Sequence, residues 1–335
     1  MDETKFKEVL KLKKKIFVTG GTGFIGSHIV PKLLDNYEVY ALTRYVANRK
    51  PDLPEDVNVV YGDLRSHFKI TKLIRSIQPD IVLHLGALTP VAYSFEHPQE
   101  VTETNYIGTI NLASANLSNP NLEKFVFAGT SEEYGNQTEF PIKESAKLNP
   151  NQPYAVSKVA ADLYLRYLEQ ATDFPVVIVR PFNTYGRKRN FNFVTESIIY
   201  QMLQGKDKVY LGNPEPIRDF LYVEDHVSGY LSVLEADLCP TVVNICTGVG
   251  TSIRQLAEKI KELVGYSGKI VWKKTYTRPT EINCLIGDNS LARDTLGWEP
   301  KYSLKEGLEE TISYIRNKTC FQKPVYTPYY FPTSP

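Results

Sequence analysis

The chain has 335 residues, with 39 basic and 38 acidic side chains and a formal net charge of +1. This balance gives no long-range attraction to nucleic acid or anionic lipid, so we expect no nucleic-acid partner. Hydrophobic residues make up 42% and charged residues 23%, a globular composition that excludes a disordered or fibrous chain. The length exceeds that of one ordinary domain and predicts either two domains or one large composite domain.

The cysteine and histidine patterns indicate the setting of the protein. The four cysteines form no C-x-x-C pair, which predicts reduced thiols and a cytoplasmic location. The five histidines show no metal-ligand spacing, so no metal is expected, and His84 lies inside an apolar run as a core residue would. The longest apolar stretches fall short of the roughly 20 residues that a membrane helix needs. We therefore expect no membrane association.

Short apolar runs alternate with helical stretches through the first half of the chain. Helices are expected at 24–36 and 67–78, and strands at 15–21, 38–43, 58–63, 80–87, 124–131 and 175–183. Near-continuous apolar strands separated by amphipathic helices predict an α/β fold, a doubly wound parallel sheet covered on both faces. Beyond Asn183, glycine and proline clusters interrupt this pattern. The interruption predicts a smaller C-terminal lobe.

A glycine-rich turn follows the first expected strand. Gly21, Gly23 and Gly26 fit G-x-G-x-x-G, and Gly20, Gly23 and Gly26 fit T-G-x-x-G-x-x-G. Glycines between a strand and a helix allow a tight turn and a close approach of the backbone to a pyrophosphate. The helix N-terminus adds free N–H groups and a partial positive charge. This context predicts a dinucleotide site rather than a flexible loop.

The end of the second strand indicates which dinucleotide binds. NAD sites usually place an acidic residue there to hold the ribose 2′-hydroxyl, whereas this chain has Thr43-Arg44, with Arg49 and Lys50 nearby. A guanidinium can pair with a 2′-phosphate, so we expect NADP, with NAD as the alternative. Arg44 could also be a solvated surface charge. After the third strand, Asp63 would contact the adenine or cap the next helix.

A tyrosine and a lysine four residues apart carry the expected chemistry. Tyr154 and Lys158 lie in a helix that opens at Pro153, and residues with this spacing share a helix face. A nearby ammonium lowers the pKa of a phenol, so Tyr154 is expected to accept a proton near neutral pH. Such a pair often arises by chance. It gains specificity here from the dinucleotide turn that precedes it.

A series of motifs resembles one enzyme superfamily. TGGTGFIG, GDL, HLGA, NYIGTINL, YAVSK, RPFNTYG and RDFLYVEDHV, in this order, look like motifs of the extended short-chain dehydrogenases/reductases, the nucleotide-sugar epimerases and dehydratases. The likeness runs from about Lys15 to Asn317. It implies a Rossmann domain at 13–182 with 221–247 and a nucleotide-sugar-binding α/β lobe at 183–220 with 248–317. It also implies a homodimer built on a four-helix bundle; residues 318–335 are expected to form a tail.

The resemblance also assigns residues to the two ligands. The cofactor would be held by the glycine turn, by residues near the strand ends and by the Tyr/Lys helix, namely Gly20, Thr22, Gly23, Phe24, Ile25, Arg44, Asp63, Leu64, Leu85, Ala87, Tyr154 and Lys158. The nucleotide sugar would be held by Thr89, Asn183, Val194, Arg218, Arg278 and Glu281. Arg218 and Arg278 would bind the diphosphate, which suits the fork geometry of guanidinium.

The residues after the fifth strand indicate a branch of the superfamily. Sugar 4-epimerases typically carry a run of serines there, whereas Thr130-Ser131-Glu132 has the form found in GDP-mannose 4,6-dehydratases. Dehydration needs a base at C5 and an acid at the C6 oxygen of the sugar, and one carboxyl group can serve both steps. The expected catalytic residues are therefore Thr130, Glu132, Tyr154 and Lys158. Glu133 is expected to face solvent.

The expected activity is conversion of an NDP-hexose to an NDP-4-keto-6-deoxyhexose, and two alternatives stay open. An NAD-dependent 4-epimerase similar to UDP-glucose 4-epimerase would use Tyr154 and Lys158 and leave Glu132 incidental. A non-catalytic NADP-binding sensor would not need the Tyr154–Lys158 pair, whose presence argues against it. GDP-mannose dehydratases typically have two basic residues after the second strand, and this chain has only Arg44 there. The base and the sugar of the substrate are therefore open.

Overall fold

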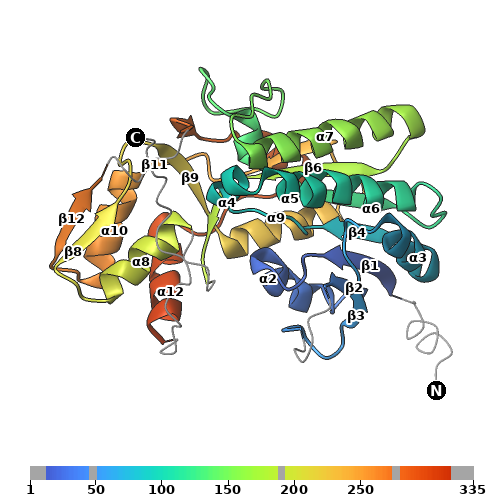
Figure 1. Cartoon of the computed structure of the whole chain (residues 1–335), viewed down its shortest axis with the longest axis horizontal. Helices are drawn as coiled ribbons and strands as arrows, with labels where there is room; N and C mark the ends of the chain where they lie inside the picture. Colours follow the sequence, from blue (N-terminus) through green and yellow to red (C-terminus); the bar gives the residue numbers. More distant parts are fainter. Residues whose placement is uncertain (1–12, 45–50, 188–192, 274–279, 318–335) are drawn as a thin grey trace.

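The computed structural model describes residues 13–44, 51–187, 193–273 and 280–317 (Figure 1). A parallel sheet with the strand order β10-β6-β5-β4-β1-β2-β3 forms the larger lobe. Its strands are β1 (Lys14–Thr19), β2 (Tyr37–Thr43), β3 (Asn58–Tyr61), β4 (Ile81–His84), β5 (Lys124–Ala128), β6 (Val176–Pro181) and β10 (Val242–Ile245). The predicted α/β fold and its six strands are confirmed, and β10 adds a seventh.

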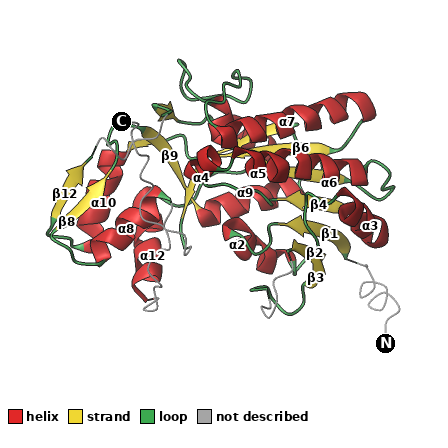
Figure 2. Ribbon diagram, viewed as in Figure 1, coloured by secondary structure: helices red, strands yellow, loops and turns green. Residues whose placement is uncertain are grey.

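Helices cover both faces of the sheet, which explains why its strands are apolar throughout (Figure 2). Successive side chains on a strand point to opposite faces. In β1, Ile16 and Val18 belong to one apolar cluster and Phe17 to another. The first cluster includes residues of α2 (Phe24–Leu33) and α9 (Val223–Glu235), and the second includes residues of α3 (His67–Ile77), α6 (Gly108–Asn116) and α7 (Pro153–Thr172).

The segment that connects β4 to β5 contains a residue that holds the loop directly after β4 in place. It runs through α4 (Val91–Glu96), α5 (Pro98–Thr102), a π-helical turn η1 (Glu103–Ile107) and α6. Asn105 accepts a hydrogen bond of 2.7 Å from the Leu88 N–H and donates one of 3.1 Å to Ser157 of α7. His84 is a buried core residue, as predicted, and bonds Thr19 at 2.7 Å and Thr109 at 2.9 Å.

The smaller lobe, at the left of Figure 1, contains short strands and helices. Strand β9 (Ile217–Tyr222) pairs with β7 (Asn183–Tyr185), β11 (Gly250–Ser252) and β13 (Cys284–Leu285), and β8 (Lys208–Leu211) pairs with β12 (Lys269–Trp272). The helices are α8 (Val194–Leu203), α10 (Ile253–Val264) and α12 (Leu304–Asn317), and α11 (Ser290–Leu296) packs against β10. The apolar cluster that contains Ile16 continues into this lobe through Ile198, Leu256 and Leu308.

Two further properties bear on the setting of the protein. Cys239, Cys246 and Cys284 carry free thiols. Within the residues that the structure describes, no helix combines the length and the apolar character that crossing a bilayer requires.

Candidate active site

A cavity of about 1370 Å³ lies where the carboxyl ends of the central strands meet the smaller lobe. Doubly wound sheets bind ligands at this edge, where the strand order reverses, and here the reversal falls between β1 and β4. The walls come from the glycine turn, the segments after β4 and β5 and the start of α7, and from β7, α8 and β9 of the lobe. Pockets for one small molecule measure roughly 300–1,000 Å³. The cavity therefore has room for two ligands.

The glycine turn between β1 and α2 has a backbone that only glycine allows. Gly20 has a φ of +73°, and a Cβ there would lie 2.8 Å from the Gly86 nitrogen. A Cβ on Gly26 would lie 2.2 Å from the Gly20 carbonyl oxygen, so α2 starts close against the turn. No side chain caps α2 after Gly23, which leaves the first N–H groups of the helix for phosphate oxygens. The turn fits a dinucleotide pyrophosphate.

Most residues predicted to hold the cofactor line this cavity: Gly20, Thr22, Gly23, Phe24, Ile25, Arg44, Leu85, Ala87, Tyr154 and Lys158. The structure does not bring Asp63 and Leu64 to it. Asp63 accepts hydrogen bonds from the side chain and backbone of Arg65, which lower the pKa of Asp63, and α3 begins only after Ser66. The Leu64 side chain packs into the core under α6 instead. Arg49 and Lys50 lie outside the described residues.

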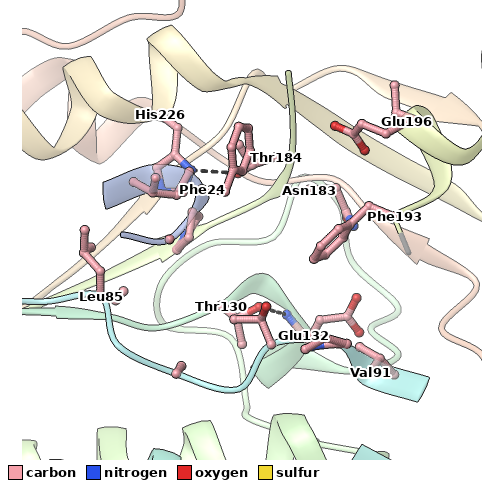
Figure 3. A pocket seen from close by; sticks show the side chains of 18 of the residues that line it. Phe24, Leu85, Val91, Thr130, Glu132, Asn183, Thr184, Phe193, Glu196 and His226 are labelled. Atoms are coloured by element: carbon pink, nitrogen blue, oxygen red, sulfur yellow. Dashed lines mark hydrogen bonds between the residues drawn. The ribbon is translucent and has the colours of Figure 1, made fainter. Parts of the chain in front are cut away.

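A single 3₁₀ turn, η2 (Ser131–Tyr134), presents Thr130 and Glu132 at the end of β5. The Thr130 hydroxyl caps this turn and accepts a hydrogen bond of 3.3 Å from the Glu132 N–H. The Glu132 side chain is buried, and its Oε2 accepts a bond of 2.6 Å from Gln152 Nε2. Both side chains belong to the cavity wall (Figure 3). The turn therefore holds a carboxylate and a hydroxyl next to each other in the cavity.

Tyr154 and Lys158 lie one turn apart on α7 and are buried in the same wall. Lys158 Nζ lies 4.0 Å from the centroid of the Phe127 ring. Burial lowers the pKa of Lys158 to about 8, against the opposing effect of nearby carboxylates. The predicted lowering of the Tyr154 pKa is wrong for this structure. Burial raises that pKa and outweighs the hydrogen bond with Thr130, which lowers it, so these neighbours alone keep Tyr154 a phenol.

The prediction that Glu133 faces solvent is also wrong. Its side chain is fully buried, and Oε2 accepts a bond of 2.9 Å from Arg180 Nε on β6. Its Oε1 accepts a bond of 3.0 Å from the Thr130 N–H. Successive residues of a 3₁₀ turn point about 120° apart. Because Glu132 points to the cavity, Glu133 points into the protein toward Arg180.

The structure gathers five of the six predicted substrate residues in the cavity wall: Thr89, Asn183, Val194, Arg218 and Glu281. Arg218 and Glu281 form an ion pair with Nη2 and Oε1 3.2 Å apart. The Asn183 Oδ1 atom is buried with no hydrogen-bond partner among the described residues. Buried polar atoms are normally paired, so Asn183 is suited to receive a donor from a ligand. Arg278 lies outside the described residues.

Several residues of the cavity wall were not predicted. Figure 3 shows Thr184 and His226 joined by a hydrogen bond, whose length is 2.7 Å. Glu196 of α8 also lines the cavity and accepts a bond of 3.0 Å from the Gly186 N–H. Gln152, which bonds Glu132 without being part of the wall, carried a usable signal, because a residue before a helix-opening proline occupies the N-cap position at the start of the helix. The positions of Thr184, Glu196 and His226 in the wall depend on how elements far apart in the sequence pack together.

Known proteins resemble the chain along nearly its whole length. The family model described as GDP-mannose 4,6 dehydratase matches residues 17–311. GDP-mannose 4,6-dehydratase of Vibrio cholerae is 32% identical over an alignment of 349 positions, which covers 90% of this chain and 93% of that enzyme.

Two solved structures extend the likeness to epimerases. UDP-glucose 4-epimerase of Thermotoga maritima with UDP-glucose is 32% identical, with a TM-score of 0.84 over 90% of this chain and 99% of that chain. UDP-glucose 4-epimerase of Thermus thermophilus in complex with NAD is 28% identical, with a TM-score of 0.82 over 91% and 99%. The chain therefore belongs to the nucleotide-sugar dehydratase and epimerase family of the extended short-chain dehydrogenases/reductases.

Proposed function

We propose that the chain is a nucleotide-sugar 4,6-dehydratase of the GDP-mannose 4,6-dehydratase type, which converts an NDP-hexose to an NDP-4-keto-6-deoxyhexose. The observation that carries the proposal is the buried Glu132 carboxylate, which lines the same cavity as Thr130, Tyr154 and Lys158. Elimination of water across C5 and C6 requires an acid–base group in this place. A 4-epimerase, which only exchanges one hydride between the two faces of a sugar, does not require such a group.

The first step needs a proton acceptor at the C4 hydroxyl of the sugar. Tyr154 takes this proton, and its hydrogen bond with Thr130 orients the phenol. A bound oxidised nicotinamide supplies the hydride acceptor and donor, together with a positive charge that favours the ionised form of Tyr154. Lys158 contributes a second positive charge from the same helix face.

The second step uses Glu132. A ketone at C4 makes the C5 hydrogen acidic, and the Glu132 carboxylate removes it. The same group then gives a proton to the departing C6 hydroxyl, so that one water leaves. Gln152 holds one carboxylate oxygen at 2.6 Å and fixes its orientation. The hydride removed from C4 is added to C6, and a proton that exchanges with solvent passes from Tyr154 to C5, so substrate and product differ by one water.

A nucleotide-sugar 4-epimerase is the second candidate, and the likeness to the Thermotoga maritima enzyme favours it. Tyr154 and Lys158 would do the same work in this reaction. Glu132 would then only hold the η2 turn against Gln152.

The replacement Glu132→Gln separates the two candidates. For a dehydratase we expect the rate of dehydration to fall about 10²–10⁴-fold, with cofactor binding retained. The control Tyr154→Phe loses either reaction. Mass spectrometry in D₂O, with GDP-, UDP-, dTDP- and CDP-hexoses supplied separately, is the measurement. Loss of water with deuterium at C5 identifies a dehydratase and its nucleotide, whereas an isomer of unchanged mass identifies an epimerase. Normal dehydration by Glu132→Gln rejects the role of Glu132.

We propose NADP as the cofactor, with NAD as the alternative. Thr43 ends β2 and Arg44 follows it, both in the cavity wall, and the Arg44 side chain is exposed there. An exposed guanidinium at this position is placed to pair with a 2′-phosphate. The NAD in the Thermus thermophilus epimerase supports the alternative.

We also propose that two copies of the chain pair through α7. Val156, Leu163 and Tyr167 share one face of this helix and are 51%, 52% and 59% exposed. Ile107 and Leu117, on the segment next to α7, are exposed as well. A row of exposed apolar side chains of this kind marks an interaction surface. Sedimentation equilibrium at the mass of two chains supports the homodimer, and the mass of one chain contradicts it.

A further inference from the structure

Four buried charged side chains connect the segments that carry the candidate catalytic residues. Arg180 of β6 bonds Glu133 of η2 at 2.9 Å and Asp162 of α7 at 2.7 Å. Lys158 lies one helical turn before Asp162, and none of the four side chains is more than 3% exposed. We call Glu133, Lys158, Asp162 and Arg180 the charge cluster.

The charges of the cluster balance only when Lys158 is included. Burying an ion is costly unless an opposite charge and hydrogen bonds compensate it. Arg180 alone faces two carboxylates, and the ammonium of Lys158 supplies the second positive charge. Arg166 also bonds Asp162 at 2.7 Å, but its side chain is 33% exposed and so partly screened by water. The Glu133 carboxylate therefore favours the charged form of Lys158.

Hydrogen bonds show the state of the Glu133 carboxyl. Oε1 accepts from the Thr130 N–H and Oε2 from Arg180 Nε, a pattern that suits an ionised carboxylate. Burial raises the pKa of Glu133 above its usual range, and the Arg180 guanidinium opposes that rise without cancelling it, so the ionised form is assigned from the two hydrogen bonds that the carboxylate accepts. The bond to Thr130 also places the η2 turn, which presents the Thr130 hydroxyl and Glu132. Glu133 thus acts on the catalytic wall through charge and through geometry.

Other ionisable groups lie beside the members of the charge cluster. The Tyr134 hydroxyl accepts a bond of 3.1 Å from Arg180 Nη1, and the Glu144 backbone carbonyl accepts one of 3.3 Å. The Glu144 carboxylate instead accepts a bond of 2.8 Å from the Asn244 N–H. His84 of β4 stays neutral, because burial lowers its pKa to about 3. The negative charge of Glu133 also raises the pKa of Tyr154 on α7.

We propose that Glu133 is a positioning residue, which keeps Lys158 charged, opposes ionisation of Tyr154 and orients Thr130 for proton transfer from the sugar hydroxyl. This inference rests on the proposed function only in that the site oxidises a sugar hydroxyl, a step that dehydratases and 4-epimerases share.

The replacement Glu133→Gln tests the charge. It keeps the length of the side chain and one acceptor oxygen but removes the negative charge. Both Tyr154 and Lys158 then lose their protons at lower pH, so both limbs of the bell-shaped pH profile of kcat move to lower pH, by about one unit. A tyrosinate absorbance titration of the protein with oxidised NADP but without substrate, with the spectrum of the matching Tyr154→Phe variant subtracted, shows the same shift for Tyr154.

The replacement Glu133→Asp tests the geometry. It keeps the charge but is one methylene too short to reach the Thr130 N–H from Arg180. We expect kcat to fall about tenfold or more, as for other small misplacements of reacting groups, while the limbs of the pH profile stay in place. Glu144→Gln is the matched control, since Glu144 also lies beside Arg180 but bonds Asn244. It leaves the pH profile unchanged.

The outcomes decide between a positioning role and a merely structural one. Unmoved pH limbs and an unmoved Tyr154 titration in folded Glu133→Gln overturn the proposal. If near-UV circular dichroism shows that this variant does not fold, Glu133→Asp decides, and an unchanged kcat overturns the proposal. The pH profile is measured on whichever product forms, a ketone or an isomer. The tyrosine titration needs no substrate, so failure of the proposed function is distinguishable from failure of this inference.

Discussion

The two sides of the cavity are built by different means. On the side of the central sheet, the wall depends on backbone approach at Gly20 and Gly26 and on a fully buried ion pair beneath η2. On the side of the smaller lobe, it depends on individual side chains such as Arg218, paired with Glu281 at 3.2 Å. The sheet side therefore tolerates little change, whereas the lobe side can change its ligand by single substitutions. Three replacements test this difference.

The largest effect is expected on the sheet side, for Gly26→Ala. The new Cβ would lie 2.2 Å from the Gly20 carbonyl oxygen, so α2 has to move away from the turn. At the upper end of overpacking costs, this weakens the cofactor affinity on the order of 100-fold. Isothermal titration with NADP and NAD measures it. Gly205→Ala is the control, because Gly205 has a φ of +65° but no atom within 4 Å of a Cβ. Wild-type affinity in Gly26→Ala would contradict the description of the turn.

A smaller effect is expected on the lobe side, for Arg218→Lys. An ammonium cannot reproduce the fork of donors that a guanidinium offers to a diphosphate. The Kd of the nucleotide sugar rises about tenfold or more, while kcat at saturation stays close to the wild-type value. Arg254→Lys is the control, since Arg254 pairs with Glu215 on the lobe surface at 2.7 Å. A loss of kcat with an unchanged Kd would place Arg218 in the chemistry instead.

The smallest effect is expected for Arg44→Ala, at the edge of the sheet side. Arg44 is exposed, so water screens its attraction for a phosphate. We expect the Kd of NADP to rise only about fivefold, as for other exposed ion pairs, and that of NAD to stay the same. Arg65→Ala, which removes an arginine paired with Asp63 away from the cavity, is the control. Equal changes for both cofactors, or none, argue against a 2′-phosphate contact.

The sequence alone predicted those features of the site whose physical cause lies within a few neighbouring residues. The glycine spacing predicts the turn because Gly20 and Gly26 meet constraints within a few residues of each other. Tyr154 and Lys158 were found because a helix places residues four apart on one face. The surroundings of Glu133 were not predictable in this way, because its partner Arg180 is 47 residues further along the chain.

The prediction of a lowered Tyr154 pKa failed for the same reason. A neighbouring ammonium is a local feature and predicts a lower pKa, whereas burial depends on the whole packed wall and raises it. Asp63 and Leu64 illustrate a third case. Their position after a strand was read correctly, but a local bond to Arg65 and packing in the core direct the two side chains elsewhere.

The apolar cluster that runs from Ile16 through Ile198 to Leu308 makes the two lobes one unit for folding. Removing the smaller lobe would expose apolar surface on the sheet side, and the lobe by itself would lose the apolar side chains of the sheet side that share its core. Exchanging substrate preference between relatives by transplanting the whole lobe would therefore disturb the cofactor half. Substitutions confined to the cavity wall avoid this cost.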